Sequence, residues 1–250
     1  MTINKKEFEI FSRQLILKEF DEKSFAEFQN KKISIIGMGG IGCPVAQYLI
    51  SCGIKNLNFY DDGLVENSNL NRQILFTVKD LNKKKVLVAK KKLLQTNPHA
   101  NINSFDKKIT KKNVSLLKDS SIIIDASDNW ITMKLINKYA LINNIPLVSS
   151  SVVGFDIQLI LFKNSIDKHL CLECIFPNKK EPNLSRCDTV GILGTAAGLA
   201  GILSAQKTIN FLMNFDNNKE VLTLIDCKIL SINQIKIKKK QDCRLQYIKK

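Results

Sequence analysis

The sequence has no apolar stretch that is long enough to cross a membrane. The stretch 190–206 carries no charged residue but is interrupted by four glycines, whereas a membrane-spanning helix needs about 20 consecutive apolar residues. The N-terminal segment mixes lysine with glutamate and lacks the apolar core of a signal peptide. We therefore expect a cytoplasmic protein without membrane contact, and we predict a buried, closely packed helix over 190–206.

The chain also lacks disulfide spacing, repeats and low-complexity segments. Its seven cysteines do not show the even, short-range spacing of a small secreted domain, which favours a reducing compartment. With 250 residues and 44% apolar content, it can bury the core of one large domain, and it belongs to neither the disordered nor the fibrous class.

Positive charge is in excess, with 38 lysines and arginines against 23 acidic residues and a net charge of +15. The lysines form clusters at 83–85, 90–92 and 107–112 and a basic tail at 236–240. No aromatic residues are interleaved with them, as a stacking platform for nucleic acid would require. A solvated basic surface is the simpler interpretation, and electrostatic steering of an anionic ligand or partner is the functional alternative.

The most informative pattern is a strand, a glycine-rich turn, a helix and a second strand that ends in an acid. A β-branched run at 33–36 leads into the glycine-rich turn 37–42, and a strand at 57–60 leads into Asp61. This order is typical of a nucleotide site, in which a phosphate lies against the free amide groups at the start of a helix.

Each of three glycines in this turn is required for a different physical reason. Gly37 permits the tight turn, Gly39 lets the backbone approach a phosphate, and Gly42 lets the helix pack closely against the strand. Asp61, nineteen residues after Gly42, is placed to accept hydrogen bonds from a ribose.

The pattern by itself fits a dinucleotide such as NAD, and the residues downstream favour ATP instead. Asn69 and Arg72 lie on a turn-rich segment, Lys85 begins a helix, and a buried strand at 122–125 leads to Asp128. An arginine, a lysine and an aspartate at neighbouring carboxyl ends of a parallel sheet would hold a triphosphate and its magnesium. A dinucleotide needs little positive charge there.

Strands and helices alternate through the first half of the chain, and strands dominate after Pro146. We predict strands at 33–36, 57–60, 102–105 and 121–125, helices at 83–95, 111–117 and 130–142, and later strands at 147–153, 157–162, 221–225 and 229–237. Repeated strand–helix units imply a parallel sheet with right-handed crossovers. The predicted fold is therefore α/β: a Rossmann-like, doubly wound, mostly parallel sheet that is extended by C-terminal antiparallel strands.

In order and spacing, these motifs resemble the MoeB/ThiF group of adenylyltransferases, relatives of the ubiquitin-activating enzymes. The resemblance runs from about 11 to 243 and rests on the segments 11–14, 37–42, 68–73, Lys85, 126–129, 171–174, and Cys187 with 191–194. It implies one adenylation domain over 1–250. That domain would have a helical arm (1–30), a nucleotide-binding half (31–145) and a carrier-binding half (146–250) with a crossover loop at about 178–190.

The resemblance also implies a reaction and its partners. The C-terminal Gly-Gly carboxylate of a ubiquitin-like sulfur carrier would react with ATP to give an acyl-adenylate and pyrophosphate, in molybdopterin or thiamine biosynthesis. The enzyme would be a homodimer. Since no sulfurtransferase domain follows the core, we expect the sulfur donor to be a separate protein.

The resemblance assigns roles to residues of this sequence. Gly39 and Gly40 would bind phosphates, Asp61 the ribose and Asp128 magnesium, while Arg13 would reach the phosphates bound by the neighbouring subunit. Arg72 and Lys85 would neutralise the phosphates, with Asn69 as a polar neighbour. We expect Asp125 to cap a helix at the end of its strand.

One departure concerns the segment after the second strand. The family usually has Asp-x-Asp where this chain has Asp61, Asp62 and Gly63. The acid with the ribose role is kept, and the second acid is shifted by one position.

The family binds zinc with two Cys-x-x-Cys pairs, and this chain keeps one pair and half of the other. Cys171 and Cys174 have the spacing of a zinc knuckle, and Cys243 is followed three residues later by Gln246, a poor zinc ligand. His169 is the candidate replacement. Zinc binding and a degraded site with packed, reduced thiols both stay open.

Cys187 lies in a polar loop among cations that would lower its thiol pKa, and some family members link the activated carrier to this cysteine. Covalent participation is one alternative, and a dispensable cysteine is the other. Cys43, Cys52 and Cys227 are most simply core-filling residues.

Two other enzyme classes and a binding module stay open. A relative that activates a group on tRNA, such as a threonylcarbamoyladenosine dehydratase, would use the same ATP site and grip RNA with the basic surface. An NAD-dependent oxidoreductase is disfavoured by Arg72, Lys85 and Asp128. A non-catalytic module is the remaining alternative, given Gly63 and the altered zinc pair.

Overall fold

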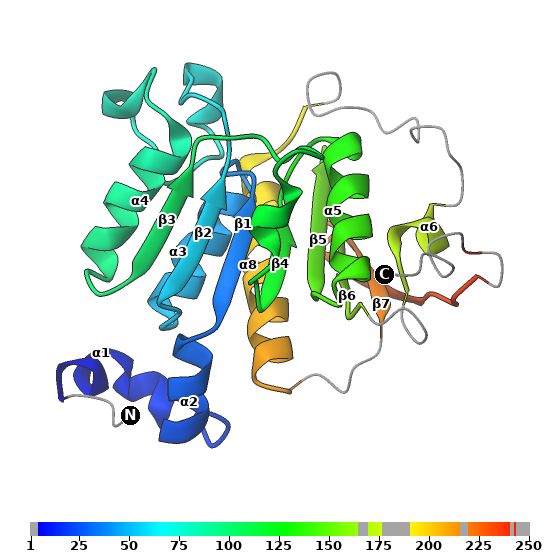
Figure 1. Cartoon of the computed structure of the whole chain (residues 1–250). Coiled ribbons are helices and arrows are strands. Elements are labelled where there is room, and N and C mark those ends of the chain that lie inside the picture. The colour runs from blue at the N-terminus through cyan, green and yellow to red at the C-terminus, as the bar shows by residue number, and fades with distance from the viewer. Residues whose placement is uncertain (1–4, 165–169, 177–190, 216–219, 241–242, 244–250) are drawn as a thin grey trace.

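The computed structural model describes residues 5–164, 170–176, 191–215, 220–240 and 243 (Figure 1). Eight strands form one sheet in the order β3-β2-β1-β4-β5-β6-β7-β8. The first five strands pair in parallel and the last three pair antiparallel, which confirms the predicted fold class. The strands are β1 Lys32–Ile36, β2 Asn56–Tyr60, β3 Asn101–Phe105, β4 Ile122–Asp125, β5 Leu147–Val153, β6 Asp156–Phe162, β7 Val221–Asp226 and β8 Ser231–Lys236.

The central strands are buried on both faces, because each feeds alternate side chains into two cores. In β1, Ile35 belongs to one core and Ile36 to the other, and in β4 the same holds for Ile124 and Ile123. Parallel sheets with such near-continuous apolar strands are covered by helices on both faces. β8 lies at the edge of the sheet and is largely exposed.

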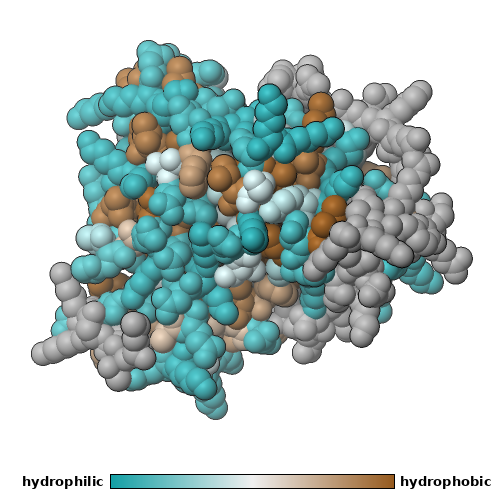
Figure 2. Space-filling model, in the orientation of Figure 1, coloured by the Kyte–Doolittle hydropathy of each residue, from teal (hydrophilic) through white to brown (hydrophobic). Residues whose placement is uncertain are grey.

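Helices cover the two faces unequally (Figure 1). The larger core lies between one face of the sheet and the helices α3 Gly42–Ser51, α4 Lys85–Thr96 and α8 Gly194–Leu212. The smaller core lies under α5 Trp130–Ile142, the 3-10 turn η3 Val114–Leu117 and the short α6 Leu172–Ile175. Two further 3-10 turns, η1 Asn67–Asn69 and η2 Val78–Asp80, connect β2 to α4. Hydrophilic residues cover most of the face seen in Figure 2.

Most predicted elements agree with the observed ones to within a few residues. No α-helix forms where one was expected over 111–117. The structure has the four-residue 3-10 turn η3 there instead. The helix expected within 190–206 begins at Gly194 and runs on to Leu212. Among the described residues, no helix is both long and apolar enough to cross a membrane.

The N-terminal arm consists of α1 Lys5–Leu15 and α2 Glu22–Gln29, and it packs where β2 begins. The Phe11 and Phe25 ring centroids are 5.1 Å apart, and both rings lie against Gly53, just after α3. The Gln14 side chain donates a hydrogen bond to the carbonyl of Cys52 (3.0 Å). The arm is therefore fixed at the end of the sheet opposite to the carboxyl ends of the parallel strands (Figure 1).

Candidate active site

The turn between β1 and α3 has no room for a side chain at two of its glycines. A Cβ on Gly42 would lie 1.9 Å from the carbonyl oxygen of Gly37. Gly37 itself has φ +93°, and a Cβ there would lie 2.6 Å from the carbonyl oxygen of Ala126. Gly39 differs, because a Cβ there would meet only the Gln73 side chain, at 3.9 Å. The first two glycines are thus required by packing, and the third leaves open space beside the backbone.

This turn offers backbone donors to an anion. No side chain caps the first turn of α3, whose N-cap is Ile41. The amide of Cys43 donates to the carbonyl of Gly39 (3.0 Å), and Pro44 has no N–H. The backbone donors that remain for an anion are therefore the amides of residues 39–42, where the helix dipole favours negative charge. The arrangement suits a phosphate group.

Asp61 holds the turn from the neighbouring strand. One carboxylate oxygen accepts a hydrogen bond from the amide of Met38 (2.7 Å), and the other accepts from the amide of Gly63 (2.7 Å). A Cβ on Gly63 would lie 2.9 Å from Asp61 Oδ1 and 3.3 Å from Lys85 Nζ. The glycine that departs from the family pattern therefore fills a place where a side chain would press on both Asp61 and Lys85.

Arg72 lies against Gly40 of the glycine turn. A Cβ on Gly40 would lie 3.3 Å from Arg72 Cγ and 3.0 Å from the Cβ of Ala197 in α8. The guanidinium donates hydrogen bonds to the carbonyl of Ser68 (2.7 Å) and to the side chain of Asn71 (3.1 Å). These bonds orient a half-buried cation beside the turn.

The side chain of Asn69 stabilises its own segment and is not open to a ligand. It is buried, and its side-chain oxygen accepts a hydrogen bond from the amide of Glu66 (3.2 Å), which closes η1. Its carbonyl accepts from the amide of Arg72 (3.1 Å). Asn69 thus shapes the segment that carries Arg72.

The turn after β4 adjoins Gly37 and carries two acids with different environments. Asp125 is fully buried, and burial raises its pKa to about 6, opposed by hydrogen bonds from the Ser127 hydroxyl and amide. Asp128 is exposed. The expected helix cap at Asp125 is wrong, because Asn129 caps α5 by accepting from the amide of Thr132 (3.0 Å). Asp125 instead closes the turn that follows its own strand.

Arg13 does not reach the turn of its own chain. It is exposed on α1, which contacts the C-terminal end of α3 through Gln14. The glycine turn precedes the other end of α3, and ten helical residues span about 15 Å. A second chain would have to bring Arg13 to this site.

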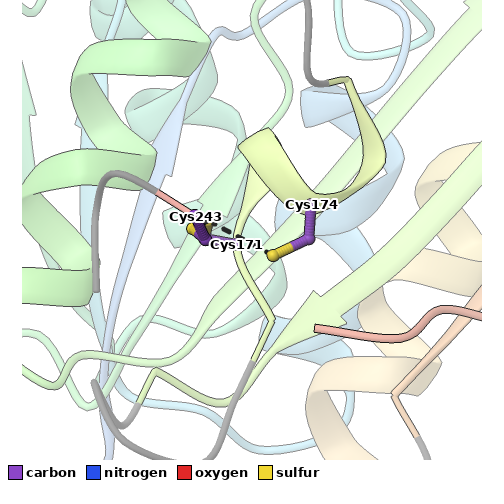
Figure 3. Close-up of side chains that lie close together, drawn as sticks. All are labelled: Cys171, Cys174 and Cys243. Atoms are coloured by element: carbon purple, nitrogen blue, oxygen red, sulfur yellow. Dashed lines mark hydrogen bonds between the residues drawn. The ribbon is translucent and has the colours of Figure 1, made fainter. Parts of the chain in front are cut away.

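Cys171, Cys174 and Cys243 form a buried cluster (Figure 3). The sulfur of Cys171 is 3.8 Å from that of Cys174 and 3.3 Å from that of Cys243. The hydrogen bond from the Cys171 thiol lowers the pKa of Cys174 to about 5 and raises that of Cys171. Zn–S bonds of about 2.3 Å put tetrahedral sulfurs about 3.8 Å apart. The Cys171–Cys174 pair has this separation, and all three sulfurs lie within 4.8 Å of one another, close enough to be ligands of one metal ion.

Three residues from the sequence predictions lie outside the described residues: Cys187, His169 and Gln246. Two contacts of the site were missed by sequence reasoning. A Cβ on Gly194, the first residue of α8, would lie 2.4 Å from the carbonyl oxygen of Asn71, and Gln73 faces Gly39. Gln73 and Gly194 both lie in segments that carry the family resemblance, 68–73 and 191–194, but sequence reasoning assigned neither residue a role.

Comparison with known proteins shows what the chain is similar to. A family model described as the ThiF family matches residues 11–245. The sulfur carrier protein ThiS adenylyltransferase of Escherichia coli is 31% identical over 245 residues, which cover 96% of each chain. The sulfur carrier protein adenylyltransferase of Thermus thermophilus is 30% identical over 218 residues, 85% of this chain and 80% of that protein.

A third relative is longer than this chain. The adenylyltransferase and sulfurtransferase MOCS3 of Drosophila virilis is 33% identical over 243 residues, and the match covers 96% of this chain but 54% of that protein. Among solved structures, E. coli MccB with ATP superposes with a TM-score of 0.79 at 20% identity, over 98% of this chain and 82% of that one. This last likeness concerns the fold alone.

The two kinds of glycine predict different effects of adding one methyl group. Gly42→Ala should lower the free energy of unfolding by roughly 3 kcal/mol, because the Cβ overlaps a backbone oxygen that cannot move freely. Gly39→Ala, the matched control in the same turn, should change it by less than about 1 kcal/mol. Urea unfolding followed by circular dichroism measures both, and equal midpoints for the two variants would contradict the packing argument.

Proposed function

The chain belongs to the ThiF family, and on this basis we propose that it is an ATP-dependent adenylyltransferase for a ubiquitin-like sulfur carrier. The C-terminal Gly-Gly carboxylate of the carrier attacks the α-phosphorus of ATP. A carboxylate–phosphorus bond forms, the bond to the pyrophosphate oxygen breaks, and the acyl-adenylate and pyrophosphate are the products. The carrier belongs to molybdopterin or thiamine biosynthesis, and a separate protein donates the sulfur.

One observation carries the proposal: a cation and an acid from different segments both contact the glycine turn, the acid at Met38 and the cation at Gly40. Arg72 lies against Gly40, and Asp61 binds the amide of Met38. Negative charge on the departing pyrophosphate grows in the transition state, so fixed cations stabilise it more than an acid or base would. This makes phosphoryl chemistry, rather than hydride transfer, the reaction that suits the site.

The proposed roles follow from position. The turn at Gly39 and Gly40 binds phosphates, Arg72 and Lys85 neutralise them, and Asp61 binds the ribose. Each oxygen of Asp61 accepts one backbone hydrogen bond and keeps a further lone pair for a hydroxyl. Asp128, exposed on the segment after β4 whose first residues adjoin Gly37, holds magnesium, for which a carboxylate is a suitable ligand.

The carrier itself can be identified by its effect on the reverse reaction. ATP–pyrophosphate exchange should depend on one of the two candidate carriers, with an intact Gly-Gly end. Asp128→Ala should reduce this exchange roughly a hundredfold or more. Without this carboxylate the protein would not hold magnesium where negative charge develops on the departing pyrophosphate. Asp119→Ala is the matched control, an exposed acid that precedes β4 at its other end. Exchange that survives in the Asp128 variant would refute the assignment.

We further propose a homodimer in which Arg13 completes the site of the neighbouring chain. Its distance from its own glycine turn supports a role in trans. A mixture of Arg13→Ala and Asp128→Ala chains tests this, because a mixed dimer contains one site without either substitution.

With equal amounts of the two variants and free exchange of chains, half of the dimers are mixed and half of their sites are intact. The mixture should therefore recover about a quarter of the wild-type exchange rate, although each variant alone is inactive. If Arg13 serves its own chain, every site keeps a defect and mixing recovers nothing.

Zinc is the proposed occupant of the cysteine cluster, where it would tie the C-terminal segment to α6. The supporting observation is the spacing of the three sulfurs. Protein purified without chelator should contain one zinc ion per chain, and Cys243→Ser should lose it, whereas Cys52→Ser, outside the cluster, should keep it. A zinc content below about a tenth of an equivalent in the wild type would end this proposal. For Cys187, covalent capture of the carrier stays a prediction.

A tRNA-modifying relative is the second candidate, and one surface feature favours it. Five lysines, at 79, 83, 84, 91 and 92, line a hollow of about 910 Å³ beside η2 and α4. The acid in this hollow, Asp80, pairs with Lys92. Tight tRNA binding that weakens steeply with salt, together with tRNA-dependent ATP turnover, would favour this candidate over the sulfur carrier.

A further inference from the structure

Gln73 is a buried polar residue whose side chain faces the glycine turn. It is 3% exposed, and its backbone is held on both sides, since its amide donates to Asn69 (2.9 Å) and its carbonyl accepts from Phe76 (2.9 Å). Its side-chain nitrogen lies 3.9 Å from the place that a Cβ on Gly39 would take. The carboxamide thus borders the open space beside Gly39.

The oxygen of this carboxamide has no hydrogen-bond partner among the described residues. An unpaired buried polar atom destabilises the folded state, and an apolar side chain of similar shape would avoid that cost. Packing therefore does not explain a glutamine here. The unpaired oxygen is an acceptor and cannot bond to a phosphate oxygen, so a phosphate contact has to come from the side-chain nitrogen, which is the atom that faces Gly39.

Two consecutive residues, Arg72 and Gln73, lie beside two consecutive glycines of the turn. Arg72 lies against Gly40 and Gln73 against Gly39, while Asp61 binds the amide of Met38. Arg72 brings charge, and Gln73 brings two neutral N–H donors. A neutral donor adds a directed hydrogen bond without adding to the excess of positive charge.

We propose that Gln73 is a nucleotide-binding residue whose side-chain N–H donates a hydrogen bond to an ATP phosphate oxygen in the space beside Gly39. This inference rests on the proposed function, since it requires that ATP binds at the turn. It assigns to Gln73 a contact with the phosphates rather than with the base or the ribose.

Calorimetric titration of ATP and of adenosine into the full chain tests the contact. Gln73→Met keeps the length of the side chain but removes the donor, and it should weaken ATP binding roughly tenfold. Gln73→Glu places a carboxylate beside the phosphates and should weaken ATP binding further. Adenosine lacks phosphates, so its affinity should not change in either variant.

The chain offers a matched control in Gln29. This glutamine is also buried, at 4% exposure, with an unpaired side-chain nitrogen, and it ends α2 in the N-terminal arm, away from the turn. Gln29→Met should therefore leave ATP affinity at the wild-type value. In ATP–pyrophosphate exchange, Gln73→Met should raise KM for ATP and leave KM for the carrier unchanged.

Two results would overturn the inference about Gln73 while the proposed function stands. Either ATP affinity within twofold of wild type in both Gln73 variants, or an equal loss of adenosine affinity, would exclude a phosphate contact. A wild-type chain that binds no ATP would overturn the proposed function itself, and the Gln73 contact with it.

Discussion

The absence of side-chain volume in the turn between β1 and α3 is the constraint on which the site depends. With a Cβ on Gly42 1.9 Å from the Gly37 oxygen, only glycine lets α3 start so close to the end of β1. That close start brings the backbone amides of residues 39–42 to the carboxyl edge of the sheet. It also brings Gly37 onto the backbone of Ala126, so the turns after β1 and β4 form one surface.

Other segments are then arranged on this turn by short polar contacts. Asp61 joins the turn to the loop after β2 through the amides of Met38 and Gly63. Lys85 lies beside Gly63, and Arg72 lies between Gly40 and the start of α8. The result places two cations beside the turn and the loop that Asp61 joins to it, which is the arrangement that the proposed phosphate site needs. Gln73 adds a buried carboxamide whose oxygen is still unpaired.

Regions far from the turn depend on contacts between distant parts of the chain. The sulfur of Cys243 lies 3.3 Å from that of Cys171, 72 residues earlier, although the sequence offers only half of the second zinc pair. The N-terminal arm is fixed by Phe11, Phe25 and Gln14 at the end of the sheet away from the glycine turn. A site that uses Arg13 would therefore need two chains.

The sequence alone determined the fold class and the type of site, because both depend on local patterns. β-Branched runs such as 33–36 specify buried strands, and the spacing from Gly37 to Asp61 specifies a nucleotide turn. Local periodicity does not fix where tertiary packing ends a helix, and a 3-10 turn over Val114–Leu117 takes the place of the helix expected over 111–117. Only the tertiary structure decided that Asn69 and Asp125 stabilise turns, that Gly63 makes room for Asp61 and Lys85, and that Gln73 faces Gly39. The physical reason is that burial, steric fit and hydrogen-bond partners arise between segments that are distant in sequence, so no local pattern contains them.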